Sequence, residues 1–146
     1  MGRFQRGFTV IDVLTTVAIV TVLASIAYPS YVAQMRKTHR AEAATALATL
    51  AQAQERFYAR FRTYSSNVVG DEDCEGQGCG LGWPSELTDN EYYKLSAEGD
   101  GSSYTLSAFA HGSQLDDTDC RVMQIDDDGI KSAKNEGGGD STEVCW

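Results

Sequence analysis

Hydrophobic and polar positions are unevenly placed along this chain, and their pattern predicts two different kinds of structure. Residues 8–27 form an apolar run with one acidic residue, Asp12, near its beginning. About 20 residues, each rising about 1.5 Å in a helix, match the roughly 30 Å hydrocarbon core of a bilayer. The run therefore predicts a helix that can span a membrane, and its single carboxylate needs an explanation.

The helical pattern continues beyond Pro29 but becomes one-sided. Apolar and small residues recur at helical spacing, and the segment ATALATLAQAQ has high helix propensity. We expect one helix from Phe8 to about Phe61, with a kink or local melting between Ala24 and Pro29, because proline removes a backbone donor and clashes with the preceding turn. The expected core-facing stripe is Ala43, Leu47, Leu50, Ala51, Gln54, Phe57, Tyr58 and Phe61. The positions placed towards solvent or neighbouring molecules are Arg36, Lys37, Arg40, Glu42, Gln52, Glu55, Arg56 and Arg60.

From residue 63 onward the sequence changes to glycine, serine, aspartate and short alternating runs, which indicates a β-rich part. Segments 92–96, 103–110 and 119–126 are typical of strands, and a tight turn at 127–129 leads into one last short strand. Three or four antiparallel strands packed on the helix stripe would each bury one face. The predicted fold class is α+β, a long amino-terminal α-helix kinked near Pro29 with a small antiparallel β-sheet head.

Length and charge limit the possible functions. A chain of 146 residues is long enough for one compact domain and an appendage. A formal net charge of −9 argues against nucleic acid as the main partner. Six basic residues are candidate DNA contacts, but solvation of the helix or contact with neighbouring molecules is the preferred interpretation of them: Arg36, Lys37, Arg40, Arg56, Arg60 and Arg62.

Candidate chemistry is sparse. His39 and His111 are the only histidines, and the chain has no GxSxG, no HExxH and no phosphate-binding glycine loop, so we predict neither an enzyme nor a cofactor. Zinc is disfavoured because CEGQGC has a four-residue gap and the other two cysteines lie far from any second close pair. Acidic clusters at 71–73, 116–119 and 126–128 raise the question of calcium. They lack the ligand spacing of an EF-hand loop, so solvated turns are the preferred interpretation.

The position of the small residue Gly7 separates two kinds of targeting segment. A cleaved secretory signal has its cutting site after the apolar stretch. Here Gly7 lies before that stretch, directly after a short basic leader. Cutting at Gly7 would leave the apolar helix on the mature protein.

MGRFQRG followed by FTVIDVLTTVAIVTVLASIAYPSY resembles the amino-terminal signature of type IV prepilins. The shared features are a basic leader ending in Gly7, Phe8 as the new terminus, an acidic residue four positions further on, and a long apolar helix before Pro29 and Tyr31. A looser resemblance to the small minor pilins of Gram-negative bacteria continues through RAEAATALATLAQAQERFYARFRTY and the cysteine-bounded tail ending in CW. The family usually has glutamate where this chain has Asp12, which is one methylene shorter.

The resemblance implies a pilin-like lollipop with four parts. These are a leader (1–7), a transmembrane and filament-core helix (8–28), a continuation of the helix packed on the head (29–62), and a β-rich head with a disulfide-bounded carboxy-terminal loop (63–146). The implied function is a structural subunit, a minor pilin, of a type IV pilus that supports pilus biogenesis, adhesion or twitching motility. The alternatives are a pseudopilin of type II secretion and a pilin-like subunit that binds DNA for uptake.

The resemblance also implies roles for single residues. A prepilin peptidase would cut between Gly7 and Phe8 and methylate the Phe8 amine. Asp12 would pair with the Phe8 amine of a neighbouring subunit in the filament. Other pilin subunits and the inner-membrane assembly machinery would be the partners. Before assembly the subunit would reside in the inner membrane with its head in the periplasm, and it would then be incorporated into the extracellular pilus.

Four cysteines allow three disulfide pairings, and an even count in a translocated domain favours disulfides. The residues alone do not choose among the pairings. The pilin resemblance implies Cys120 with Cys145, which closes a carboxy-terminal loop, and Cys74 with Cys79 is then the remaining pair.

Overall fold

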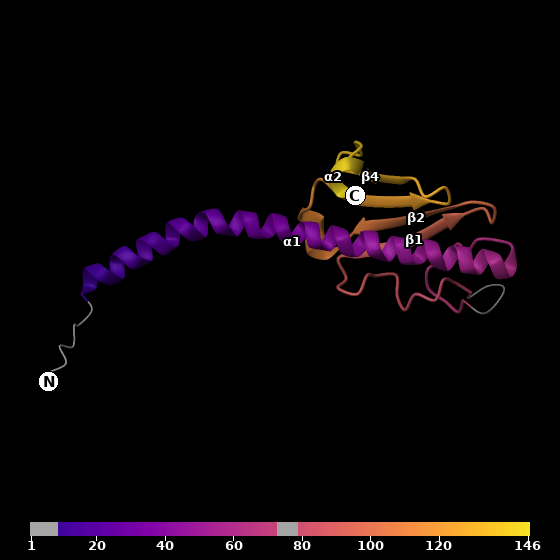
Figure 1. Cartoon of the computed structure of the whole chain (residues 1–146), viewed down its shortest axis with the longest axis horizontal. Helices are drawn as coiled ribbons and strands as arrows, with labels where there is room; N and C mark the ends of the chain where they lie inside the picture. Colours follow the sequence, from indigo (N-terminus) through magenta and orange to yellow (C-terminus); the bar gives the residue numbers. More distant parts are fainter. Residues whose placement is uncertain (1–8, 73–78) are drawn as a thin grey trace, which may run out of the picture. The chain divides into compact units, whose positions relative to one another are not determined.

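The computed structural model describes residues 9–72 and 79–146 of the chain. Between Met35 and Arg36 the chain divides into two compact units, an amino-terminal unit and a globular unit (Arg36–Trp146). The elements in chain order are helix α1 (Val10–Phe61), strands β1 (Tyr93–Gly99) and β2 (Tyr104–Ala110), the 3-10 helix η1 (Gly112–Asp116), strands β3 (Val122–Asp126) and β4 (Lys131–Lys134), and helix α2 (Thr142–Cys145) (Figure 1).

Helix α1 ends at Phe61, where the hydrophobic pattern predicted its end. Arg62 has a positive φ of 59°, the left-handed conformation that commonly terminates a helix. Pro29 lies inside α1, and the helical state continues without interruption through the preceding turn. The expectation of local melting between Ala24 and Pro29 is therefore wrong, because the loss of one backbone donor does not end a helix that is bonded on both sides. A kink at this point stays a prediction.

The four strands form one antiparallel sheet in the order β1-β2-β3-β4. Each strand pairs with the next along the chain, so the sheet is a meander. Its connections are short turns except between β2 and β3, where residues 111–121 include η1. The predicted strands, including the last short one after the turn at 127–129, are confirmed. Together, the long amino-terminal helix and the antiparallel sheet confirm the α+β fold class.

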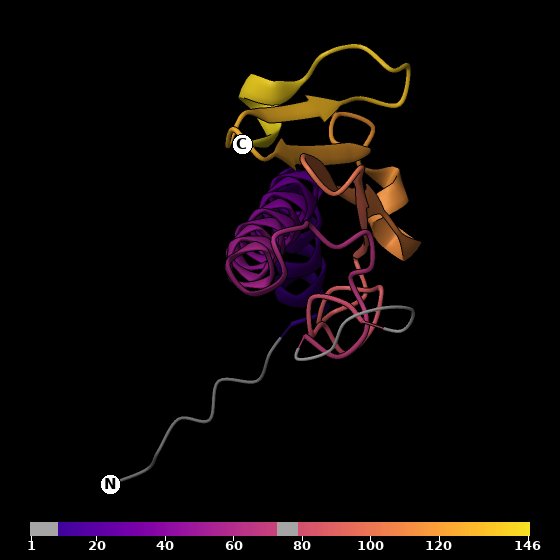
Figure 2. The same cartoon turned by 90° about the vertical axis from the view of Figure 1, so that its right-hand side faces the viewer.

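The core of the globular unit lies between α1 and one face of the sheet (Figure 2). Leu47 and Leu50 of α1 and Leu95 and Leu106 of the sheet are almost completely buried. Full burial of a leucine side chain contributes about 1.5 to 3 kcal/mol, so the helix stripe is a principal source of stability. In the predicted stripe, Ala43, Leu47, Leu50, Gln54 and Phe57 are buried, whereas Ala51, Tyr58 and Phe61 are half-buried.

Gln54 is the polar member of the buried stripe, and its amide explains how the chain turns after α1. Its Nε2 donates to the Ser65 carbonyl at 2.7 Å, and its Oε1 accepts from the Ser65 amide at 2.9 Å. Both polar groups of a buried amide are thereby satisfied by a backbone segment 11 residues later. This pair of bonds holds the chain against the helix where the β-rich part begins.

Candidate functional site

The first turn of α1 contains the acidic residue that the sequence analysis singled out. Gly7 and Phe8 lie outside the described residues, so cleavage and methylation there stay predictions. Thr9 and Asp12 form a reciprocal cap: the Asp12 amide donates to Thr9 Oγ1 at 3.3 Å, and the Thr9 amide and hydroxyl donate to Asp12 Oδ2 at 3.0 and 2.8 Å. This capping box satisfies donors that the first turn leaves unpaired. Both bonds to the carboxylate use Oδ2, and none within residues 9–72 and 79–146 reaches Oδ1.

The surface of α1 after Asp12 is almost entirely apolar. Large side chains from Val10 to Ile26 are 51 to 79% exposed. Among the described residues, α1 is long enough and apolar enough to cross a bilayer. Its hydroxyls do not interrupt this surface, because Thr15, Thr16 and Thr21 each donate to a backbone carbonyl three or four residues earlier. The segment can therefore face lipid or another apolar helix without an unpaired donor.

Arg40 is buried, which corrects the expectation that it faces solvent or a neighbouring molecule. Its Nε and Nη2 donate to the two carboxylate oxygens of Asp117 at 2.7 and 2.6 Å, so the pair is bidentate. The side chain of Asp117 is 1% exposed, so it is not part of a solvated acidic turn as predicted for 116–119. The bond to Asp117 raises the pKa of Arg40 above its usual value, against the opposing effect of burial. Arg40 is thus unavailable as a DNA contact.

A buried amide extends this ion pair into a network. Gln114 Nε2 donates to Asp117 Oδ2 at 2.8 Å and to the Tyr93 hydroxyl at 3.1 Å. Its Oε1 therefore faces His39, whose Nδ1 lies 2.8 Å away and must carry the proton as donor. The His39 ring stacks on Tyr92 at 3.5 Å between centroids. Burial raises the pKa of Tyr93 to about 12, so its hydroxyl is neutral at physiological pH.

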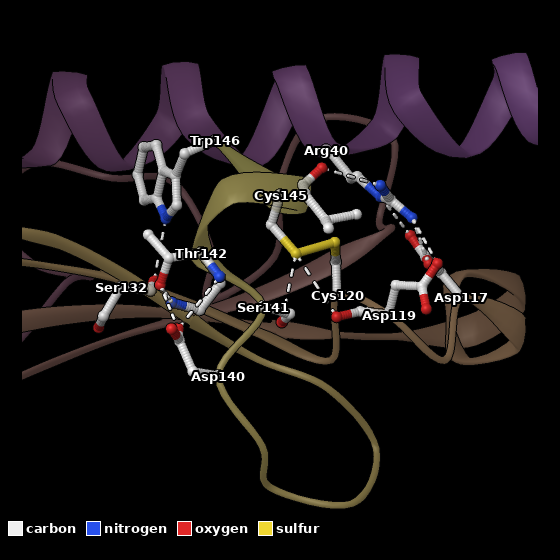
Figure 3. The surroundings of a disulfide bond; sticks show 12 residues. Arg40, Asp117, Asp119, Cys120, Ser132, Asp140, Ser141, Thr142, Cys145 and Trp146 are labelled. Carbon is white, nitrogen blue, oxygen red and sulfur yellow. Dashed lines mark hydrogen bonds and ion pairs between the residues drawn. A yellow bond between two sulfur atoms is a disulfide. The ribbon is translucent and has the colours of Figure 1, made fainter.

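A disulfide joins Cys120 and Cys145 beside this network (Figure 3). This is the pairing that the pilin resemblance implied. Arg40 Nη1 also donates to the Val144 carbonyl at 3.2 Å. The guanidinium therefore ties α1 to the carboxy-terminal segment as well as to Asp117, towards which Arg40 points in Figure 3. The disulfide thus ties the tail to the segment before β3, and the hydrogen bond from Arg40 ties it to α1. Cys74 lies outside the described residues, so its pairing with Cys79 stays a prediction.

Beside α1 the globular unit has a groove of about 510 Å³, which we call the lateral groove. Glu42 lies in it, and its carboxylate accepts bonds from the Asn90 amide at 3.1 Å and from Asn90 Nδ2 at 2.9 Å. Burial acts to raise the pKa of Glu42, but hydrogen bonds from Asn90 and Thr88 outweigh it and lower that pKa below its usual value. Glu42 is therefore ionised and held by neutral donors. The lining residues are Thr38, Ala41, Glu42, Thr45, Ala46, Thr49, Trp83, Thr88, Asp89 and Asn90.

Several exposed cations of the globular unit lie beside acidic groups. Arg56 pairs with Glu72 at 3.6 Å, and Arg60 donates to the Glu72 carbonyl at 3.3 Å. On the sheet side, Lys94 pairs with Glu86 and Arg121 pairs with Glu136. Of the six basic residues considered as DNA contacts, Arg40 and Arg56 are thus ion-paired with acidic side chains of the same chain. In the described part of the chain, no three His, Cys, Asp or Glu side chains are arranged as metal ligands.

Sequence reasoning found the apolar helix but missed the functional pairings around it. The capping box was visible in principle, because a threonine followed three residues later by an acidic residue before an apolar run is its signature. The Arg40–Asp117 pair had no such signal, since 77 residues separate its members. Glu42 was expected to face solvent or a neighbouring molecule, and the structure places it, half-buried, in the lateral groove.

Comparisons with known proteins agree on one kind of protein. The family model described as "Type IV minor pilin ComP, DNA uptake sequence receptor" matches residues 29–124, more than half of the chain. Among curated proteins, the type IV major pilin protein PilA of Myxococcus xanthus (strain DK1622) is 37% identical over 75 residues, which are 48% of this chain and 34% of PilA. The match thus spans about a third of that relative's length.

Among solved structures, a type IV pilin from Shewanella oneidensis superposes with a TM-score of 0.46 and 24% sequence identity. The superposition covers 66% of this chain and 89% of that pilin.

Proposed function

Because the chain belongs to the type IV minor pilin family of ComP, we propose that it is a membrane-held subunit that enters a type IV pilus through the apolar surface of α1. The observation that carries this proposal is the run of exposed apolar side chains that begins directly after the Thr9–Asp12 cap. Such a surface is costly in water, and only lipid or other apolar helices can cover it. Pilin family and fold are structural, not enzymatic.

Lipid and filament are two successive environments for the same surface. In the inner membrane, acyl chains would surround the apolar first part of α1, up to residue 27, while the globular unit lies in the periplasm. In the pilus, the same helix of other subunits would replace the lipid, with the inner-membrane assembly machinery transferring each copy. Hydroxyls that bond their own helix suit both environments, because neither offers water to an unpaired donor.

Asp12 supplies the directional contact that an apolar surface lacks. A charge within a membrane helix costs about 2.5 to 3.5 kcal/mol at the centre and less near the interface. A prepilin peptidase cut between Gly7 and Phe8 would create an amine with an ordinary pKa of about 7.7 to 8.0, mostly protonated at neutral pH. Thr9 occupies Asp12 Oδ2, which leaves Oδ1 to accept from the Phe8 amine of a neighbouring copy. This pairing would neutralise both charges and set the axial position of the incoming subunit.

The test compares Asp12→Ala with Asp12→Glu in cells that assemble the pilus. We measure the ratio of sheared-filament to membrane-bound protein and the intact mass of each fraction. Asp12→Ala should remain in the membrane but be depleted from filaments, whereas Asp12→Glu should enter filaments as the parent does. A parent chain that is absent from sheared filaments, or whose mature form begins after Ala27, would overturn the proposal.

DNA uptake is the second candidate function, because the description of the matched family names a DNA uptake sequence receptor. The chain's charge of −9 and its ion-paired cations Arg56, Lys94 and Arg121 oppose it. A gel-shift titration with duplex DNA at several salt concentrations decides the matter. A receptor should bind one sequence in preference to its scrambled version, with affinity falling as salt rises. Equal, weak binding to both duplexes would remove this candidate.

A further inference from the structure

The lateral groove has the size and shape of a binding site. Its volume of about 510 Å³ lies within the range of about 300 to 1,000 Å³ typical of ligand sites. One wall is a side of α1, where residues at helical spacing from Thr38 to Thr49 face the cavity. The opposite wall is the loop that contains Trp83 and the segment 88–90. Nothing in the proposed pilin function above uses this groove.

The groove is negatively charged. Glu42 is fixed at its wall by two bonds from Asn90, and Asp89 is exposed on the same loop. Within residues 9–72 and 79–146, no Lys or Arg pairs with Glu42 or Asp89. His39, one turn before Glu42, is a minor cause of the lowered pKa of Glu42. A carboxylate held ionised by neutral donors retains its full charge for an incoming cation.

The rest of the lining favours a cation carried on an aliphatic stem. Trp83 is half-buried, and its indole N–H donates to the Leu87 carbonyl at 3.3 Å, which fixes the ring in the groove wall. The hydroxyls of Thr45 and Thr49 donate to helix carbonyls, so towards the groove they offer acceptor lone pairs. Aromatic and acceptor groups beside carboxylates suit the stem and head of lysine or arginine.

We propose that in the filament the lateral groove of one copy receives Arg36 and Lys37 of a second copy, an inference that rests on the proposed function. These two side chains make no ion pair among the described residues, and Lys37 is exposed on α1. A basic pair on one copy and an anionic groove on the other are complementary surfaces of the same chain.

Zero-length cross-linking tests the contact directly. A carbodiimide joins a lysine Nζ to a carboxylate as an amide, and the water lost in that condensation is taken up by the reagent as it becomes a urea. Sheared filaments of the parent chain should give a dimer whose digest contains Lys37 joined to Asp89 or Glu42. The matched control is Lys37→Arg, which keeps the positive charge but cannot form this amide. Its filaments should assemble normally and lose that cross-linked peptide, and detergent-dispersed parent monomers should also lack it.

A charge exchange tests the energetics. Lys37→Glu should lower the filament fraction roughly two- to five-fold, the range expected for an exposed ion pair that becomes repulsive. Adding Asp89→Lys to that variant should restore incorporation. Normal filaments without the Lys37 cross-link, or no restoration by the exchange, overturn the groove contact and leave the pilin function standing. Absence of the parent chain from filaments overturns the pilin function and this contact with it.

Discussion

Replacing Arg40 with alanine should be among the most destabilising single changes in the globular unit. The substitution leaves the Asp117 carboxylate 1% exposed, without its bidentate partner and with Gln114 as a remaining donor. Breaking a buried ion pair from one side costs about 3 to 5 kcal/mol. It also removes the bond to the Val144 carbonyl. At about 4 °C per kcal/mol for a unit of this size, we expect Tm to fall by roughly 12 to 20 °C.

The measurement is urea and thermal unfolding of the full chain in mild detergent under non-reducing conditions, followed by tryptophan fluorescence. Trp83 and Trp146 both lie in the globular unit, so the signal reports that unit. The matched control is Arg56→Ala, which breaks an exposed pair with Glu72 and should cost about 1 kcal/mol or less.

A double replacement separates a lost interaction from a buried unpaired charge. Arg40→Met combined with Asp117→Leu removes both charges, and similar replacements of buried pairs are often neutral or stabilising. Most of the stability lost in Arg40→Ala should therefore return in the double variant. If Arg40→Ala cost no more than Arg56→Ala, or if the double variant were as unstable as Arg40→Ala, the reasoning from burial would be refuted.

Three further predictions concern the carboxy-terminal loop, the β1–β2 turn and the helix cap. Changing Cys120 and Cys145 together to serine opens a loop with a sequence separation of 25 and should lower the unfolding free energy by about 3 to 4 kcal/mol in urea titrations, so an unchanged midpoint would contradict it. Hydrogen bonds from Ser102 and Ser103 lower the pKa of Asp100 to about 2. The ionised Asp100 therefore contributes to folding stability above pH 4, and this contribution is lost as the pH falls to about 2. The stability gap between the parent and Asp100→Ala should therefore narrow between pH 7 and pH 2.5, and a constant gap would count against it. Thr9→Val removes the cap acceptor and should speed amide exchange in the first turn about 2- to 30-fold, against no change at Thr45→Val.

The sequence was sufficient for those parts of the fold that depend on local periodicity. The end of α1 at Phe61, the core-facing leucines Leu47 and Leu50 and the four strands all follow from patterns within about ten residues. Each such pattern has a local physical cause, helix propensity or alternating burial, so it can be recognised without knowledge of the fold. The proline inside α1 led to the wrong expectation of local melting, because its effect depends on the backbone hydrogen bonds of the helical turns on both sides.

The parts that sequence reasoning missed depend on contacts between distant segments. Arg40 looks like any other basic residue on a polar helix face, and its burial follows from η1 and the tail being placed beside α1. Asp117 likewise sits in a run of acidic residues that reads as a solvated turn. Whether a charged residue is buried or solvated depends on its ion-pair partner. A partner 77 residues away in the sequence produces no local pattern that could identify it.

A single copy exposes an apolar surface and an anionic groove, and the two differ in the kind of partner that can cover them. The apolar surface that begins at Val10 is non-directional, so lipid and other helices cover it almost equally well. The anionic groove around Glu42 is directional, because a cation must arrive at one level with one orientation. Lipid tails can cover the apolar surface, but they cannot supply a cation to the groove. In the proposed membrane-bound state, lipid would cover the apolar surface and leave the groove unpaired, whereas a second copy in the proposed filament would cover both. In that assembly the apolar surface would hold the subunit, and the charges at Asp12 and in the lateral groove would determine its position in the filament.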